Sequence, residues 1–289
     1  MLGTANTMSA LSESLGMSLM GSSTIPAVLA ARMAKGVETG EKIVELVQKG
    51  VTTRDILTED AFENAVMLLL TMGGSTNGIL HLQAIYHEAG LGELPLSVFD
   101  EFSRRIPQVA SIYPASEFDM VDFYEGGGVP AVLKEIEEYL HKDTLTVSGL
   151  TMGEALSRFS YTNNRNMIKS AEEPFAPTGG VAILKGNIAP LGCVIKPAAV
   201  PKHMFRYSGR AQVFTTEEES YQAVLEGRVK PGTCMVLMYE GPKGGPGMPE
   251  MYKTMKYLEG MGLSDTCALI TDGRFSGSNR GLFVGHISP

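Results

Sequence analysis

The spacing of apolar residues divides the chain into two parts. Up to about residue 170, apolar residues recur every three or four positions, which is typical of amphipathic helices. The stretch 159–178 is polar and contains Pro174 and Pro177, which indicates a linker. Beyond it, short apolar runs bounded by glycine or proline predict strands.

The first part is predicted to be mostly helical. Gly36 and Gly50 are placed where helices end, and Gly73-Gly74 should stop a strongly apolar helix. One short strand is expected at 108–113. The expected helices are 24–34, 38–48, 59–71, 78–88, a short one from Ser97, and 129–140.

The second part predicts strands with two helices among them. The helices are expected at 216–226, with three glutamates favourably placed in its first turn, and at 250–261. The predicted fold class is therefore α/β, with a helix-rich α/β region at 1–168 and a strand-rich region at 169–289. The expected strands are 180–186, 193–196, 210–214, 234–238 and 267–271.

Composition narrows the function classes. The 289 residues carry 24 basic and 32 acidic side chains, a net charge of −8, so neither a nucleic acid nor a membrane surface is an expected partner. Three Cys without a CxxC pair favour a reducing cytoplasm. No apolar run reaches the ~18 residues of a membrane span, and no signal-peptide pattern opens the chain.

A loop rich in glycine and proline, 239–250, is the densest candidate for chemistry. It does not match a phosphate-binding GxxxxGK[ST] loop. Glu250, at the expected start of the next helix, could ligate a hard metal ion or cap the helix. From spacing alone, an ordinary connecting loop is the favoured interpretation.

Two further polar loops are candidates. Ser276 follows an apolar strand, but a nucleophilic serine needs a base, and the one nearby histidine, His286, does not by its spacing make a triad. Ser75, Thr76 and Asn77 lie between two helices, where backbone amides could bind a carboxylate. Residue types alone favour a loop serine in the first case and a capped turn in the second.

Thirteen strings in one order, from residue 3 to the last residue, resemble the dihydroxy-acid dehydratase and 6-phosphogluconate dehydratase family. The last two strings are the most distinctive. The strings are GTANTM, LGMSL, TIPAV, TTRDILT, AFENA, GGSTN, YPASE, GGVPAV, LTVSG, GGVAILKGNIAP, GRAQVF, YEGPKGGPGMPEM and TDGRFSGSNRGLFVGHISP.

The resemblance implies a hydro-lyase that converts a 2,3-dihydroxy carboxylic acid into a 2-keto acid. The dihydroxy-acid dehydratase of branched-chain amino-acid biosynthesis is the favoured member of the family. The resemblance implies Mg²⁺ and an iron–sulfur cluster as cofactors, with Ser276 as the catalytic base and Glu250 as a magnesium ligand. Ser75, Thr76 and Asn77 are then expected near the substrate. A dehydratase for aldonic or phosphorylated sugar acids of the same family is the alternative.

The resemblance also has gaps. In the family, a cluster cysteine stands five residues before the first Thr of TANTM, which would fall before Met1, and Cys193, Cys234 and Cys267 lie in other contexts. We therefore expect an internal fragment of a homodimeric enzyme. Residues 1–168 would be the C-terminal part of the N-terminal α/β domain, and 169–289 most of a swivelling β/β/α domain. A non-catalytic truncated polypeptide is the alternative of another class.

Overall fold

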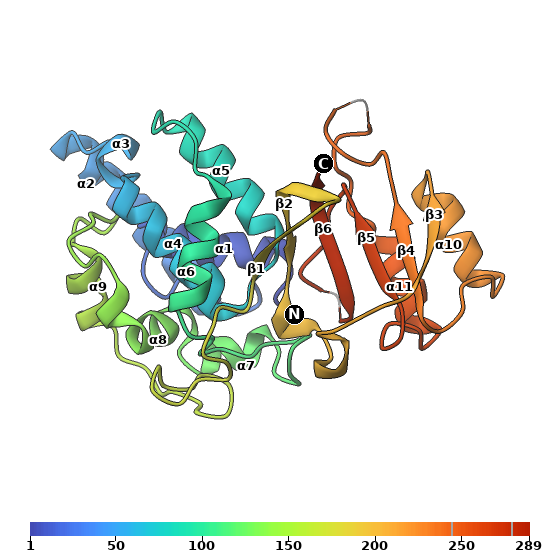
Figure 1. Cartoon of the computed structure of the whole chain (residues 1–289). Coiled ribbons are helices and arrows are strands. Elements are labelled where there is room, and N and C mark those ends of the chain that lie inside the picture. The colour runs from blue at the N-terminus through green and yellow to red at the C-terminus, as the bar shows by residue number, and fades with distance from the viewer. Residues whose placement is uncertain (244, 279) are drawn as a thin grey trace. The chain divides into compact units, whose positions relative to one another are not determined.

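A computed structural model describes residues 1–243, 245–278 and 280–289. Gly244 and Asn279, which belong to the last two of the family strings, lie outside the described residues. The structure is mixed α/β, as predicted, and divides into two compact units (Figure 1). The first unit comprises 1–74 and 78–180, and the second comprises 75–77 and 181–289. None of the helices that the structure describes combines the length and the apolar character needed to cross a bilayer.

The first unit is helical and is built around α4. Eleven of the fourteen residues of α4 are buried, because its sequence is apolar on nearly every side. Its helices are α1 (Thr4–Ser14), α2 (Ala30–Lys49), α3 (Thr53–Ile56), α4 (Glu59–Met72), α5 (Asn77–Glu88), α6 (Leu96–Arg105), α7 (Met120–Glu125), α8 (Gly128–Glu135), the 3₁₀ turn η1 (Glu137–Tyr139) and α9 (Met152–Arg158).

Several predicted boundaries in this unit hold and others are wrong. α4 and α5 match their predictions within one residue, and Gly73 ends α4 in the left-handed conformation (φ 58°). Gly36 does not end a helix, because α2 continues through it without interruption to Lys49. The strand expected at 108–113 is reduced to two isolated bridges, from Gln108 to Ala176 and from Ala110 to Ile168. The helix expected at 129–140 ends at Glu135.

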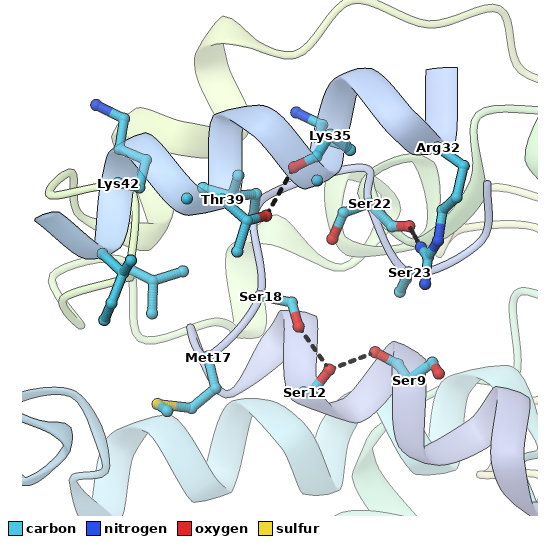
Figure 2. Close-up of a pocket in the computed structure, with 15 residues that line it drawn as sticks. Ser9, Ser12, Met17, Ser18, Ser22, Ser23, Arg32, Lys35, Thr39 and Lys42 are labelled. Atoms are coloured by element: carbon cyan, nitrogen blue, oxygen red, sulfur yellow. Dashed lines mark hydrogen bonds between the residues drawn. The ribbon is translucent and has the colours of Figure 1, made fainter. Parts of the chain in front are cut away.

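A hollow of about 740 Å³ lies in the first unit beside α2 (Figure 2). Arg32, Lys35 and Lys42 line it together with five serines. Arg32 Nη1 donates to the Ser22 carbonyl at 2.8 Å. Lys35 and Lys42 pair with glutamates of α2, each at 2.8 Å. The charges of Lys35 and Lys42 are therefore compensated by carboxylates, whereas the partner of Arg32 is a neutral carbonyl.

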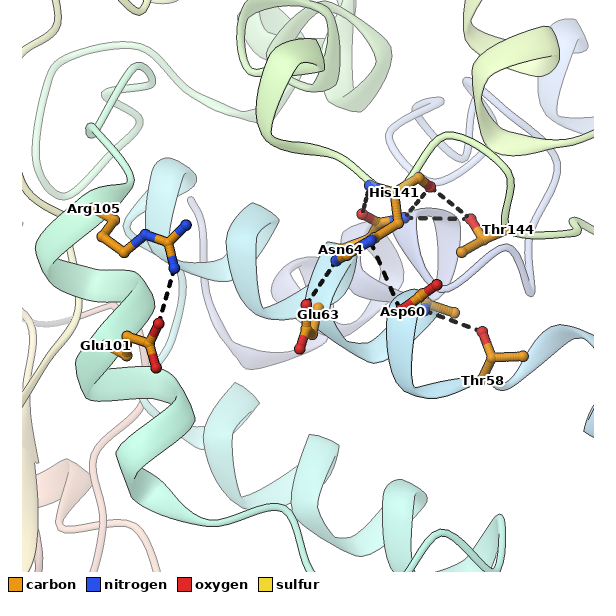
Figure 3. A network of polar contacts seen from close by, with 9 residues as sticks. Thr58, Asp60, Glu63, Asn64, Glu101, Arg105, His141 and Thr144 are labelled. Atoms are coloured by element: carbon orange, nitrogen blue, oxygen red, sulfur yellow. Dashed lines mark hydrogen bonds and ion pairs between the residues drawn. The ribbon is translucent and has the colours of Figure 1, made fainter.

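A polar network fixes the chain after η1 to α4 (Figure 3). Asn64, which is fully buried, donates through Nδ2 to the His141 carbonyl at 3.0 Å and accepts from the His141 amide at 2.9 Å. Asn64 Nδ2 also donates to Thr144 Oγ1 at 3.3 Å. The Glu63 carboxylate meets His141 Nε2 at 2.6 Å. One side chain of α4 thereby satisfies the backbone of a loop 77 residues away.

The second unit is a six-stranded mixed sheet in the order β1-β2-β6-β5-β4-β3. Strands β3 to β6 are parallel, while β2 is antiparallel to both β1 and β6. Its elements are β1 (Ala182–Gly186), β2 (Ala189–Ile195), the 3₁₀ turns η2 (Pro197–Ala199) and η3 (Lys202–Met204), β3 (Arg210–Phe214), α10 (Glu217–Leu225), β4 (Thr233–Leu237), α11 (Tyr252–Gly260), β5 (Ala268–Thr271) and β6 (Leu282–Ser288).

The sheet carries a core on each face. Phe283 packs with residues of α10, α11 and the parallel strands, whereas its neighbour Val284 packs with Ile195, Val200 and Met204. Successive strand residues point to opposite faces, so the two clusters lie on opposite sides of the sheet. The helices predicted at 216–226 and 250–261 are confirmed as α10 and α11. The strand β6 was not predicted from the sequence.

Candidate active site

The candidate site lies in the second unit, in the loops that follow β4 and β5. The loop after β4 contains Glu250, and the loop between β5 and β6 contains Ser276. Such loops follow the carboxyl ends of parallel strands, where α/β proteins hold ligands. The residues Ser75, Thr76 and Asn77 are grouped with this unit by their contacts.

The Asp272 carboxylate joins the two loops. Its Oδ1 accepts from the Glu240 amide at 3.0 Å, and its Oδ2 accepts from the Gly241 amide at 3.0 Å. A Cβ on Gly241 would lie 2.9 Å from Asp272 Oδ2, so a larger residue there would displace the carboxylate from this position. Two backbone donors are thus satisfied by one charged acceptor, which is a strong form of hydrogen bond.

Glu240 has a structural role in this arrangement. Its Oε1 accepts from the Glu217 amide at 3.2 Å and so caps the first turn of α10. Burial raises the pKa of the Glu240 carboxyl, and the nearby charges of Glu217 and Asp272 raise it further. A carboxyl with these partners is engaged in holding the fold.

Glu250 lies just before α11 rather than in its first turn, which corrects the expected placement. It forms an isolated parallel bridge with Arg274, whose Nε donates to the Met248 carbonyl at 2.6 Å. Met248 has a positive φ of 57°, an uncommon conformation for this residue type. The segment before α11 is therefore tied to the Ser276 loop through backbone contacts.

The Glu250 side chain meets Asn77. Asn77 Nδ2 donates to Glu250 Oε1 at 2.5 Å. Asn77 is fully buried, and its own amide donates to Ser75 Oγ at 3.2 Å. A buried amide that donates to one carboxylate oxygen fixes the carboxylate's orientation.

Ser276 is half-buried and has polar neighbours on both sides of the loop. Ser278 Oγ donates to Ser276 Oγ at 3.2 Å. Thr76 Oγ1 donates to the Phe275 carbonyl at 3.4 Å. Thr76 and Ser276 also line the same small pocket, together with Val194, Lys196, Phe275, Gly277 and Phe283. The structure thus brings Thr76 beside Ser276 and Asn77 beside Glu250, while Ser75 orients the turn.

Lys196 is a pocket residue that the sequence did not single out. It follows β2 directly and is only 4% exposed. Its Nζ donates to the Gly277 carbonyl at 3.3 Å. Burial lowers the pKa of its ammonium to about 8. The sequence feature that could have pointed to Lys196 is its position at the end of the apolar run CVIK. Lysine is almost never fully buried unless it is paired.

Metal-ligand groups are limited in the part of the chain that the structure describes. Those residues contain no set of three or more His, Cys, Asp or Glu side chains that could hold a metal ion. Cys193, Cys234 and Cys267 are all free thiols, and Cys193 and Cys267 donate to backbone carbonyls. The described residues therefore supply Glu250 as one candidate metal ligand and no complete site.

Comparison with known proteins gives one consistent family. The N-terminal model of dihydroxy-acid/6-phosphogluconate dehydratase matches residues 1–155, and the C-terminal model of the same family matches 166–289. A protein named dihydroxy-acid dehydratase from Caldanaerobacter subterraneus subsp. tengcongensis is 49% identical over 288 residues, which are 99% of this chain and 51% of that protein.

Two further relatives carry the same name. The proteins of Ignicoccus hospitalis and Methanococcoides burtonii are 47% and 49% identical, each over 99% of this chain and 52% of their own length. The chain therefore spans about half the length of the curated relatives it matches. Because both family models match and together cover nearly all of the sequence, the chain belongs to the dihydroxy-acid/6-phosphogluconate dehydratase family.

Proposed function

We propose that the full gene product carrying this chain is a hydro-lyase that removes water from a 2,3-dihydroxy carboxylic acid to give a 2-keto acid. The favoured substrate is the dihydroxy acid of branched-chain amino-acid biosynthesis. The observation that carries the proposal is the match along the whole chain to proteins named dihydroxy-acid dehydratase at 47–49% identity.

The chain's own residues support a proton transfer. In the proposed reaction, the deprotonated Ser276 Oγ takes the proton from C2, the C2–H electron pair forms the C2–C3 double bond, and the C3 hydroxyl leaves as hydroxide. The resulting enol takes up a proton at C3 and releases its hydroxyl proton to become the ketone. The hydroxide takes the proton that Ser276 removed from C2, so the net change is the loss of one water. The hydrogen bond from Ser278 holds the Ser276 oxygen in place for the first step.

Glu250 is the proposed magnesium ligand of this chain. Carboxylate oxygens are the ligands that Mg²⁺ prefers, and the Asn77 contact fixes the orientation of this one. The residues that the structure describes do not by themselves complete a magnesium site or an iron–sulfur site. Both cofactors therefore stay a proposal for the full gene product, and the steps above use only side chains of this chain.

The setting of the enzyme is also proposed. The free state of all three cysteines supports a reducing compartment such as the cytoplasm. The acidic balance of the chain supports a small-molecule substrate rather than a nucleic acid or a membrane surface. A homodimer is the oligomeric state that the family resemblance implies.

The test is an assay of the full gene product, prepared without oxygen. We expect it to convert 2,3-dihydroxyisovalerate into its 2-keto acid faster than it converts gluconate or 6-phosphogluconate. Preference for the sugar acids would favour the alternative, a sugar-acid dehydratase. The matching family also includes 6-phosphogluconate dehydratase. Turnover of none of these acids by protein with a full metal content would reject the hydro-lyase assignment.

A further inference from the structure

The Lys196 ammonium sits in surroundings that strongly disfavour a charge. Apolar side chains of Val194, Phe275 and Phe283 line the pocket on its sides. Among the described residues, Lys196 Nζ makes its polar contact with the Gly277 carbonyl, and Lys196 forms no ion pair. The hydroxyls of Thr76 and Ser276 are the other polar side chains of this pocket, and neither is a carboxylate. A buried cation without a carboxylate partner costs free energy of folding.

What Lys196 holds is the residue next to the proposed base. Gly277 follows Ser276 directly, so the hydrogen bond from Nζ fixes the peptide between Gly277 and Ser278, on the C-terminal side of the serine. The ammonium and the Ser276 side chain line the same narrow pocket. In apolar surroundings, a positive charge stabilises a nearby developing negative charge far more than it does in water.

We propose that Lys196 is a positioning residue for Ser276: its ammonium holds the Gly277 carbonyl, orients the serine, and favours the deprotonated state of the serine oxygen. This inference rests on the function proposed above. It requires Lys196 to be charged in the active state, and the lowered pKa of about 8 then places the loss of this charge within the working pH range. Activity should accordingly fall as the pH rises through about 8.

A second lysine provides a matched comparison. Lys256 Nζ donates to the Ser278 carbonyl at 3.2 Å, so it also tethers this loop, one residue further along. It is paired with Glu259 at 2.6 Å and is about a third exposed, so its charge is neutralised and screened. A change that acts only by loosening the loop should have similar effects at both lysines, whereas an effect of charge should appear at Lys196.

The experiment compares Lys196→Met, Lys196→Arg, Lys256→Met and Lys185→Met in the full gene product. Lys185 is an exposed residue of β1 and controls for the loss of a charge on the same sheet. We expect Lys196→Met to lower kcat by about 10²-fold with little change in KM, as for the loss of one group that stabilises developing negative charge. Lys185→Met should behave as the wild type, and Lys256→Met should keep the wild-type pH profile.

The pH profile separates positioning from a merely structural role. The wild type should lose activity above about pH 8, Lys196→Met should show no such limb, and Lys196→Arg should move the limb above about pH 10, because guanidinium keeps its proton. A flat wild-type profile from about pH 7 to about pH 9 overturns the proposal without any variant. A Lys196→Met enzyme with wild-type kcat also overturns it.

Amide hydrogen exchange of the peptide spanning 272–281 gives a readout that does not need turnover. We expect faster exchange in Lys196→Met than in Lys185→Met, since the loop loses its tether in the first variant only. If the wild type turns over none of the acids, the proposed function fails, and the exchange rates still decide whether Lys196 holds the loop. Equal rates in the two variants would overturn the positioning role.

Discussion

The Asp272 carboxylate accepts a hydrogen bond from each of two successive backbone amides, those of Glu240 and Gly241, at 3.0 Å. This contact joins the loop after β4 to the loop after β5, which are the two segments that carry Glu250 and Ser276. The hydrogen bonds of the Asp272 carboxylate go to the backbone of Glu240 and Gly241, so its effect on activity should come through the geometry of the two loops.

Changing Asp272 to Asn should therefore destabilise the protein and lower activity together. The new NH₂ group would face a backbone donor, so at least one hydrogen bond is lost and one buried amide is left without an acceptor. We expect a loss of about 1–3 kcal/mol in the free energy of unfolding, measured by urea denaturation. Asp265→Asn, the same change at an exposed position, should have no measurable effect.

Ser276 and Ser278 should differ sharply in their effect on the reaction. Ser276→Ala removes the proposed base, and we expect kcat to fall by about 10³-fold with the fold intact. Ser278→Ala removes only the hydrogen bond to Ser276, so a fall of about 10-fold is expected. Steady-state rates with 2,3-dihydroxyisovalerate measure both. Similar rates for Ser276→Ala and the wild type would exclude Ser276 as the base.

Glu250 should control the magnesium requirement of the full gene product. Glu250→Gln removes the negative charge that a hard cation needs, so the Mg²⁺ concentration for half-maximal activity should rise at least about 10-fold. Asn77→Asp should raise it too, by turning the amide donor into a second acceptor and breaking the contact with Glu250. Glu218→Gln, at an exposed position of α10, is the control. Unchanged Mg²⁺ dependence in Glu250→Gln would remove this residue from the magnesium site.

Local patterns predicted most elements of the fold. The helix α4 was predictable because fourteen consecutive residues favour one helix and Gly73 ends it. The same signals failed at Gly36, because a glycine ends a helix only where the chain turns, and the residues around it continue α2. The strand β6 was hidden in a family string with four glycines, and its pairing with β5 and β2 decides its conformation.

The arrangement of the site could not be predicted from spacing. Asn77 and Glu250 are 173 residues apart, and Lys196 and Gly277 are 81 apart, so only the folded chain brings each pair together. Residue types alone favoured ordinary loops at all the candidate segments. The family resemblance pointed to Ser276 and Glu250, but it gave no indication of the Asp272 clamp or of the buried Lys196.

Asn64 should be important for stability and not for chemistry. Its side chain makes three hydrogen bonds to the segment 141–144, and it is fully buried. Replacing Asn64 by Ala leaves the His141 amide without a partner and removes one of the two hydrogen bonds to the His141 carbonyl, the other coming from Thr144 Oγ1. We expect a loss of about 2–4 kcal/mol in the free energy of unfolding. Thermal unfolding of the variant measures it, with Glu101→Ala on the exposed side of α6 as the control. A variant with unchanged stability but impaired turnover would contradict the structural role.

Glu13 should make stability depend on pH with an unusual sign. This carboxyl is 1% exposed, and burial raises its pKa although Ser23 and the Gly21 amide donate to it. A raised pKa means that the folded state keeps its proton at pH values where the unfolded chain has lost it. The contribution of Glu13 to stability is therefore largest below its ordinary pKa of 4.5 and declines as the pH rises through the folded-state pKa.

The Glu13→Gln variant isolates this contribution, because glutamine does not titrate. The free energy of unfolding of the wild type, minus that of Glu13→Gln, should fall as the pH is raised from about 4.5 toward neutrality and then become constant. Glu41→Gln, at an exposed position of α2, should give a difference that is nearly flat over the same range. Urea denaturation at a series of pH values measures both. A difference that rises with pH would mean that the Ser23 and Gly21 hydrogen bonds outweigh the cost of burying the charge.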